Sequence, residues 1–243
     1  MANAVSRLDK NVTPKHWTLE EIREVGFQGQ EDLVTYRLAK RIAPHTTWVF
    51  LRWNFAPNTL TFVFIGLLVL ASLVLALRPR DGAQIVALLI VASYIIDCSD
   101  GPVARATGRT STVGNNLDLL GHWVTSNLLI LGATLGEIGT GGSNSAWLAG
   151  MLALVGTTSF HYMQLLLVRS SPSTESAKGQ PENDISTIKR IRRIFHLFEP
   201  LDTNLILFTS LAGLPFLGIQ IWAVVSIAAT LAIFGPDYWR ETR

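Results

Sequence analysis

Three aspartates and one histidine stand at spacings that would let them share metal ions. Asp97 and Asp100 are three residues apart, and Asp118 and His122 are four apart, so each pair shares a face if its segment is helical. Clustered carboxylates repel one another and take up protons unless a cation offsets their charge. Such oxygen ligands suit Mg²⁺ or Mn²⁺, and two ions can hold both oxygens of a phosphoryl-type displacement. Helix capping, or pairing with nearby arginines, explains one aspartate better than the whole cluster.

The segments that carry these residues are apolar blocks near membrane-spanning length. Of the 243 residues, 49% are hydrophobic and 16% are charged, against about 25% charged in a soluble domain. A helix needs about 20 residues to cross the hydrocarbon core. Six spans are predicted: residues 59–77, 83–96 continued through Asp97 and Asp100, 117–138, 146–168, and two within 201–238 with a turn between Gly213 and Gly218. The sequence therefore predicts an all-α integral membrane protein with six transmembrane helices.

The distribution of Lys and Arg predicts the orientation in the membrane. Of the 20 Lys and Arg residues, only Arg78 and Arg80 fall on one side of the predicted spans. By the positive-inside rule, both termini and the four candidate ligands then face the cytoplasm. A net charge of +2, with no basic stripe interleaved with aromatic residues, argues against nucleic acid as a partner. The one cysteine, Cys98, excludes an intramolecular disulfide.

The polar lead, residues 1–57, is expected to be a cytoplasmic segment with two helices. It has no short apolar run behind a basic start, so we expect no cleavable signal peptide. Thr18 and Glu21 have the spacing of a capping box, which predicts a helix start. A second helix around residues 32–49 either lies on the membrane surface as a juxtamembrane amphipathic helix or packs on the rest of the protein. The remaining chain is expected to divide into a transmembrane domain, 58–239, and a cytoplasmic tail, 240–243.

Eight positions that run from the second predicted span into the third carry a family resemblance. The pattern is Asp97-x2-Asp100-Gly101-x2-Ala104-Arg105-x8-Gly114-x3-Asp118-x3-His122. It resembles the motif of the CDP-alcohol phosphotransferase (CDP-alcohol phosphatidyltransferase) family, which has the same spacing and ends in Asp, so that seven of eight fixed positions match. The six predicted spans, and Pro57-Asn58-x-x-Thr61 at the start of the first, also resemble the family. A transporter with intramembrane carboxylates would explain the acids but not the spacing of the Gly, Ala and Arg positions.

The resemblance implies transfer of a phosphate-linked alcohol from a CDP-alcohol to a second alcohol, with release of CMP. Two divalent ions, Mg²⁺ or Mn²⁺, would be held by Asp97, Asp100, Asp118 and His122. The nucleotide would be bound by Asn58, Thr61, Asp97, Gly101, Ala104, Arg105, Gly114 and Asp118. The glycines would let backbone approach the nucleotide, since a side chain there would collide with it. Arg105 would either pair with a phosphate or brace the carboxylates.

The resemblance leaves two arrangements of substrates open. At least one reactant is expected to be a lipid. The first expectation is phospholipid synthesis, with CDP-diacylglycerol as donor and a small polar or phosphorylated alcohol as acceptor. The second is the opposite arrangement, with a soluble CDP-alcohol and a lipid acceptor. Because dimers are usual in the family, a homodimer is expected.

His122 is the departure from the family motif. The resemblance implies that the last motif residue binds the second metal ion and deprotonates the acceptor hydroxyl, and an imidazole can do either. A neutral imidazole brings one negative charge fewer than a carboxylate, so the second ion should bind more weakly or be a softer one such as Mn²⁺. Three interpretations of this substitution stay open. His122 acts as the base, or the site uses a different substrate or metal ion, or the protein is a binding or inactive relative of the family.

Weaker candidates for contacts with the acceptor or a lipid are His161, Lys189, Arg190 and Arg193. His161 shares a face with Gln164 in the fourth predicted span, where the two could simply satisfy each other. The basic segment 189–193 could bind an anionic group or serve only as a solvated topology signal. Glu199 and Asp202, at the start of the fifth predicted span, either face the pocket or cap the span.

Overall fold

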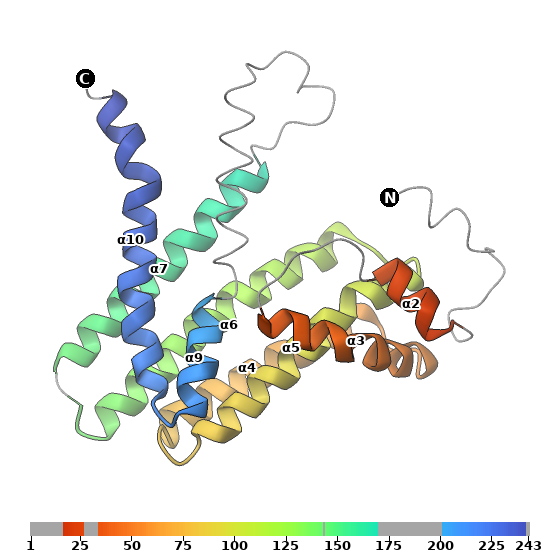
Figure 1. Cartoon of the computed structure of the whole chain (residues 1–243), viewed down its shortest axis with the longest axis horizontal. Coiled ribbons are helices and arrows are strands. Elements are labelled where there is room, and N and C mark those ends of the chain that lie inside the picture. Colours follow the sequence, from red (N-terminus) through yellow and green to blue (C-terminus); the bar gives the residue numbers. More distant parts are fainter. Residues whose placement is uncertain (1–16, 27–33, 143, 170–200, 242–243) are drawn as a thin grey trace. The chain divides into compact units, whose positions relative to one another are not determined.

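The structure, a computed structural model, describes residues 17–26, 34–142, 144–169 and 201–241. Within these ranges the chain forms helices joined by short connections and no strand (Figure 1). In chain order the helices are α2 (Leu19–Gly26), α3 (Val34–Arg52), α4 (Pro57–Leu77), α5 (Ala83–Ala106), α6 (Thr112–Gly139), α7 (Asn144–Arg169), α9 (Leu201–Leu211) and α10 (Pro215–Glu241). The predicted all-α fold is confirmed for this part of the chain.

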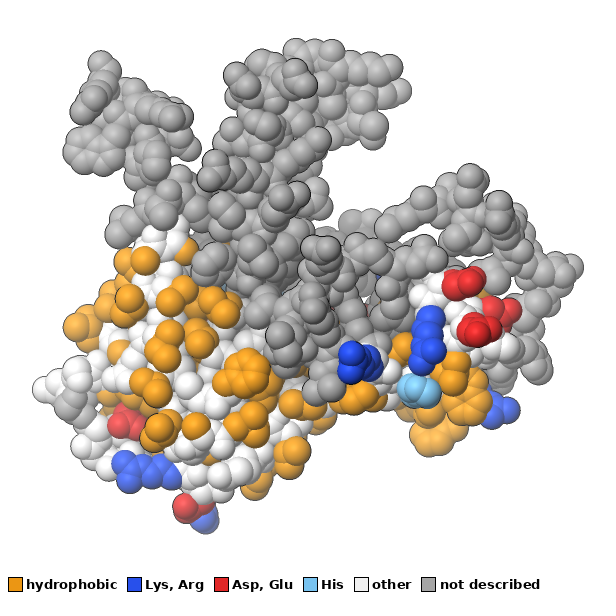
Figure 2. Space-filling view, in the orientation of Figure 1, with side chains coloured by type: hydrophobic (Ala, Val, Ile, Leu, Met, Phe, Trp, Pro, Cys, Tyr) orange, Lys and Arg blue, Asp and Glu red, His pale blue; other side chains and the backbone are white. Residues whose placement is uncertain are grey.

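Among the residues that the structure describes, three helices, α4, α5 and α6, are long and apolar enough to cross a membrane. They contain 21, 24 and 28 residues, against about 20 needed for the hydrocarbon core. Three of the six predicted spans are thereby confirmed. The other three predicted spans coincide with α7, α9 and α10, and whether these helices cross the membrane stays a prediction. Figure 2 shows hydrophobic side chains over much of the described surface, as expected of helices that face lipid.

The ends of these helices are set by capping and turn residues rather than by the apolar runs alone. Helix α6 begins at Thr112, before the predicted residue 117, because the Ser111 hydroxyl accepts a hydrogen bond from the Gly114 backbone N–H at 2.9 Å. Helix α9 ends before Gly213, whose φ of 74° marks the predicted turn, and α10 begins at Pro215.

The chain divides into two compact units. Unit 1 holds Met1–Ala71 and Leu88–Thr125, and unit 2 holds Ser72–Ala87 and Ser126–Arg243. Helices α4, α5 and α6 each contribute residues to both units. The whole Asp-rich motif, from Asp97 to His122, lies in unit 1.

The hydrophobic core of unit 1 joins the N-terminal helices to the helices that carry the motif. Ile22 of α2, Leu51 of α3, Leu60 of α4 and Val103 of α5 form one buried cluster. The predicted capping box at the start of α2 is confirmed, since the backbone N–H of Thr18 donates to a Glu21 carboxylate oxygen at 2.7 Å and the Thr18 hydroxyl accepts from the Glu21 N–H at 3.3 Å. Helix α2 is therefore built into the same core as the motif helices.

Helix α3 packs on α5 at Ser99, which lies between the motif residues Asp97 and Asp100 in the sequence. Ala39, Ala43 and Thr47, spaced by one helical turn, are buried along one face of α3. Thr46 and Ser99 share a hydrogen bond of 2.6 Å between their hydroxyl oxygens. This supports the interpretation in which the helix packs on the protein, and contact of its other face with the membrane surface stays a prediction.

In unit 2, glycines let helices approach closely. A Cβ at Gly136 of α6 would collide with the Leu75 carbonyl oxygen of α4. A Cβ at Gly156 of α7 would collide with the Ser226 side chain of α10. Close packing at small residues is typical of helices in membranes, where association depends on van der Waals contact and hydrogen bonds.

Candidate functional site

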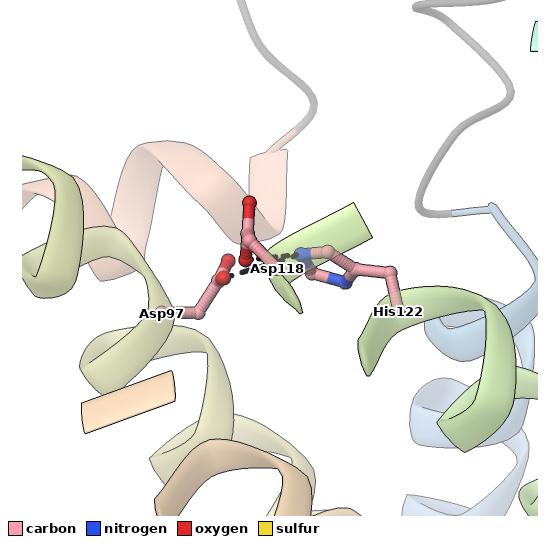
Figure 3. A group of neighbouring side chains, drawn as sticks. All are labelled: Asp97, Asp118 and His122. Carbon is pink, nitrogen blue, oxygen red and sulfur yellow. Dashed lines mark ion pairs between the residues drawn. The ribbon is translucent and has the colours of Figure 1, made fainter. Parts of the chain in front are cut away.

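Helices α5 and α6 bring three of the four candidate metal ligands together. His122 Nε2 lies 3.2 Å from Asp97 Oδ1 and 3.6 Å from Asp118 Oδ1 (Figure 3). One ligand atom from each of the three side chains lies within 4.8 Å of the others. The Asp97 side chain is 11% exposed, Asp118 is 40% and His122 is 34%, so the group is accessible on one side. We call Asp97, Asp118 and His122 the carboxylate–histidine group.

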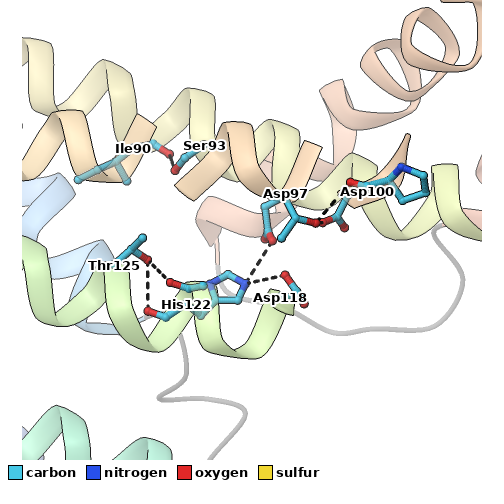
Figure 4. A network of polar contacts seen from close by, with 10 residues as sticks. Ile90, Ser93, Asp97, Asp100, Asp118, His122 and Thr125 are labelled. Carbon is cyan, nitrogen blue, oxygen red and sulfur yellow. Dashed lines mark hydrogen bonds and ion pairs between the residues drawn. The ribbon is translucent and has the colours of Figure 1, made fainter. Parts of the chain in front are cut away.

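Asp100, the fourth candidate, does not belong to this group. Its Oδ2 accepts a hydrogen bond of 2.9 Å from the Thr61 hydroxyl of α4. Figure 4 shows the Asp100 side chain outside the two ion pairs that join His122 to Asp97 and to Asp118. Thr61 is buried, with 3% of its surface exposed. Asp97 and Asp100 are thus neighbours on α5 whose carboxylates have different partners.

A pocket of about 170 Å³ lies in unit 1, between the start of α4, the end of α5 and the start of α6. It is lined by Pro57, Asn58, Thr61, Asp100, Gly101, Ala104, Arg105, Arg109, Thr110, Ser111, Gly114, Asn115 and Asp118. Every nucleotide-binding residue predicted from the sequence lines this pocket except Asp97. Asp118 lines the pocket and also belongs to the carboxylate–histidine group, so the two features adjoin.

The pocket also contains residues that the sequence analysis did not single out. Arg109, Thr110, Ser111 and Asn115 occupy variable positions of the motif, where spacing carries no signal. For Arg109, Thr110 and Ser111 the available clue was their place in the short connection from α5 to α6, because fixed motif positions on both sides of a tight connection bring the residues between them to the same edge. Asn115 lies in the first turn of α6, next to the fixed position Gly114.

The two motif glycines make room for neighbouring side chains. A Cβ at Gly114 would lie 3.1 Å from Asn58 Oδ1 and 3.1 Å from Ser111 Oγ. A Cβ at Gly101 would lie 3.2 Å from a guanidinium nitrogen of Arg105. The sequence suggested that these glycines leave space for the nucleotide itself. The structure adds that each of them admits a polar side chain that borders the pocket.

The weaker candidates lie elsewhere. His161 is buried in α7 of unit 2, and its Nδ1 lies 2.9 Å from the Thr157 carbonyl oxygen one turn earlier. Asp202 is buried near the start of α9, where its Oδ1 accepts a hydrogen bond of 2.6 Å from the backbone N–H of the next residue, Thr203. Glu199 and the basic residues Lys189, Arg190 and Arg193 lie outside the described residues.

Comparison with known proteins shows the family to which the chain belongs. No curated protein sequence matches the chain. Residues 54–234 match the family model of CDP-alcohol phosphatidyltransferases. The match covers well over half of the chain and contains the pocket and the carboxylate–histidine group. The chain therefore belongs to the CDP-alcohol phosphatidyltransferase family, in which a phosphatidyl group is transferred from a CDP-alcohol to an alcohol acceptor and CMP is released.

Proposed function

We propose that this protein is an active, metal-dependent transferase of phospholipid synthesis that uses CDP-diacylglycerol as donor and a small polar or phosphorylated alcohol as acceptor. The observation that carries the proposal is the position of Asp118, which lies both in the pocket and in the carboxylate–histidine group. This places a candidate metal site directly beside a pocket lined by the family's motif positions. Donor and metal sites that adjoin in this way suit the breaking of a pyrophosphate bond.

The donor set fits divalent metal ions, which the family generally uses. Carboxylate oxygens and an imidazole nitrogen converge within 4.8 Å, a spacing compatible with a shared ion. In the proposal, two ions, Mg²⁺ or Mn²⁺, are held by Asp97, Asp100, Asp118 and His122. When bound, they neutralise the negative charge that develops on the departing CMP. The imidazole favours Mn²⁺ over Mg²⁺ at the second site, because Mg²⁺ prefers oxygen ligands and one negative charge is missing.

The pocket residues are assigned to the donor. The pocket is lined by Asn58 and Thr61 of α4, by Gly101, Ala104 and Arg105 of α5, and by Gly114 of α6. Arg105 pairs with a phosphate or braces a carboxylate, and its place in the pocket beside Asp100 suits either role. For the acceptor and its lipid surroundings, the proposal keeps His161, Lys189, Arg190 and Arg193, on the sequence alone.

His122 has two proposed roles, which different measurements report. As a base, it accepts the proton of the acceptor hydroxyl while the oxygen attacks the β-phosphorus and CMP leaves, and Asp97 at 3.2 Å stabilises the resulting imidazolium. As a metal ligand, it uses Nε2, the nitrogen that faces both carboxylates. One nitrogen cannot bind an ion and accept a proton at the same time, so the two roles exclude each other at Nε2. A change in metal affinity on substitution of His122 would report the ligand role, and the pH dependence of turnover would report the role as a base.

The arrangement in the membrane follows from the charge distribution. In the proposal both termini and the site face the cytoplasm, residues 1–57 precede a six-helix domain at 58–239, and 240–243 form the tail. The protein acts as a homodimer, as the family resemblance implies. Labelling of Asp81→Cys, at an exposed position between α4 and α5, in a Cys98→Ser background tests the topology from either side of sealed vesicles.

The experiment that tests the activity is CMP release by the full-length protein in lipid nanodiscs. The reaction contains Mg²⁺ or Mn²⁺, mixed alcohol acceptors, and in turn CDP-diacylglycerol, CDP-choline, CDP-ethanolamine, CDP-glycerol or CDP-inositol. Release with CDP-diacylglycerol supports the proposal, and the Asp118→Ala variant supplies the inactive control. Release with a soluble donor alone supports the opposite substrate arrangement.

A second function has one observation in its favour, the histidine at the last motif position. If that residue does not support turnover, the protein is a nucleotide-binding relative without transferase activity. Binding of CDP without CMP release from any donor would select this second function. Loss of both binding and release would contradict the assignment of the pocket.

A further inference from the structure

Phe64 of α4 forms the surface on which the His122 imidazole lies. The two ring centroids are 5.2 Å apart and the ring planes meet at 28°, a stacked arrangement. Phe64 itself is 1% exposed, so its ring is fixed by the surrounding core. A fixed ring on one face restricts how the imidazole plane can tilt.

The stack depends on a close approach of α4 and α6 at Gly121. A Cβ at Gly121 would lie 2.8 Å from Ile65 Cδ1 and 3.1 Å from Phe64 Cζ. The backbone of α6 therefore rests on the Phe64 ring, and the next residue along α6 is His122. Position 121 is a variable position of the motif, so the family pattern does not by itself require glycine here.

A histidine needs such a support more than an aspartate does. The two oxygens of a carboxylate are equivalent, so either can bind an ion. An imidazole binds an ion only when its ring plane has the right tilt and the ring is rotated so that a nitrogen, and not a carbon, faces the ion. The last side-chain torsion of histidine is broad, so the helix alone does not fix that plane. Stacking on Phe64 sets the plane, and Asp97 and Asp118 then favour the rotation that turns Nε2 toward them.

We infer that Phe64 is a positioning residue that holds the His122 imidazole for metal binding through Nε2, with Gly121 admitting the contact. The inference rests on the proposed function, because it assigns a metal-ligand role to His122. It adds a residue outside the family motif to the site and explains how a ring is accommodated at the last motif position.

The test measures Mn²⁺ binding to the full-length protein in nanodiscs by electron paramagnetic resonance. An aromatic pair contributes a factor of about two to twelve to an equilibrium constant, so Phe64→Leu should raise the Kd for Mn²⁺ by about that factor. The same variant should weaken the ¹⁴N coupling that an imidazole ligand imparts to bound Mn²⁺. Phe62→Leu is the matched control, because Phe62 lies on the same helix but is 61% exposed, and it should leave both readouts unchanged.

Repeating the substitution in a second parent variant distinguishes a role of Phe64 in orienting the imidazole from a role in packing the helices. In the His122→Asp variant the ligand has no ring to orient, so adding Phe64→Leu should leave the Kd for Mn²⁺ unchanged. An equal loss of affinity in both backgrounds, or wild-type Kd and ¹⁴N coupling in Phe64→Leu, would overturn the inference.

The outcome for the proposed function is read separately. If the wild-type protein shows ¹⁴N-coupled Mn²⁺ that depends on Phe64 but releases no CMP, the positioning role stands and the proposed activity fails. If wild-type Mn²⁺ shows no ¹⁴N coupling, the role of Phe64 fails even where CMP is released.

Discussion

The hydrogen bond from Thr61 to Asp100 offers the most direct test of how the pocket works. The Thr61 hydroxyl donates to Asp100 Oδ2 at 2.9 Å from a position that is 3% exposed. Replacing Thr61 by Val keeps the shape of the side chain but removes the donor. Asp100 then loses one of the contacts that orient its carboxylate at the edge of the pocket, and it is freer to rotate away from the proposed donor site.

The size of the effect follows from the type of bond. A hydrogen bond to a charged group contributes about 1.5–3 kcal/mol. Asp100 lines an open pocket, so water can replace part of the interaction and the lower end of that range applies. About 1.5 kcal/mol corresponds to roughly a tenfold change in an equilibrium constant. We therefore expect Thr61→Val to raise the Kd for CDP in the presence of Mn²⁺ by up to about tenfold, a limit reached when all of this energy is needed to return Asp100 to its place as CDP binds.

Calorimetric titration of CDP into the protein in nanodiscs, at fixed Mn²⁺, measures this change. Thr61→Ser keeps the hydroxyl and should bind CDP nearly as tightly as the wild type. Thr59→Val changes an exposed threonine of the same helix and should have no effect. Equal affinity in Thr61→Val and Thr61→Ser would refute the reasoning, since it would mean that the orientation of Asp100 does not matter for binding.

Three further changes test other parts of the site and the fold. Asp118→Ala should abolish Mn²⁺-dependent CDP binding, because Asp118 serves both pocket and metal group, while Asp81→Ala, at an exposed position, should titrate like the wild type. His122→Asp should raise the affinity for Mg²⁺ relative to Mn²⁺, since it adds a charge and an oxygen ligand, and an unchanged ratio would show that position 122 does not contact the ion. Gly136→Ala should lower the melting temperature in detergent, because its Cβ meets a backbone carbonyl oxygen that cannot move cheaply, at a cost of about 1–3 kcal/mol. Gly66→Ala has open space around its Cβ and should be neutral or slightly stabilising.

The positions of residues within one helix could be predicted from the sequence, because spacing alone determines which of them share a face. Helical spacing within α5 and α6 predicts that each pair of candidate ligands shares a face, and in the structure Asp97, Asp118 and His122 lie together. The separate environment of Asp100 was not predictable, because it depends on a hydrogen bond from Thr61 on another helix. The stacking of Phe64 on His122 could not be predicted from the sequence either, since it depends on how closely α4 and α6 approach each other.

For helix α3, the sequence predicts an apolar face but does not predict what covers that face. An apolar face predicts only that the face is removed from water, and protein and lipid satisfy that condition equally well. The buried face of α3 and the hydrogen bond between Thr46 and Ser99 show that α5 covers part of the apolar face of α3. Since the family match begins at residue 54, this contact joins a segment outside the match to the helix that carries the motif.

The double membership of Asp118 has a thermodynamic consequence. Asp118 borders the pocket and belongs to the carboxylate–histidine group, so under the proposed function the occupancies of the nucleotide site and the ion site are linked. Linkage is reciprocal: whatever factor the ion adds to the affinity for nucleotide, the nucleotide adds to the affinity for the ion. If the ion strengthens nucleotide binding, as the proposal requires, a weak ion site and a weak nucleotide site would each stay largely empty until both ligands are present together.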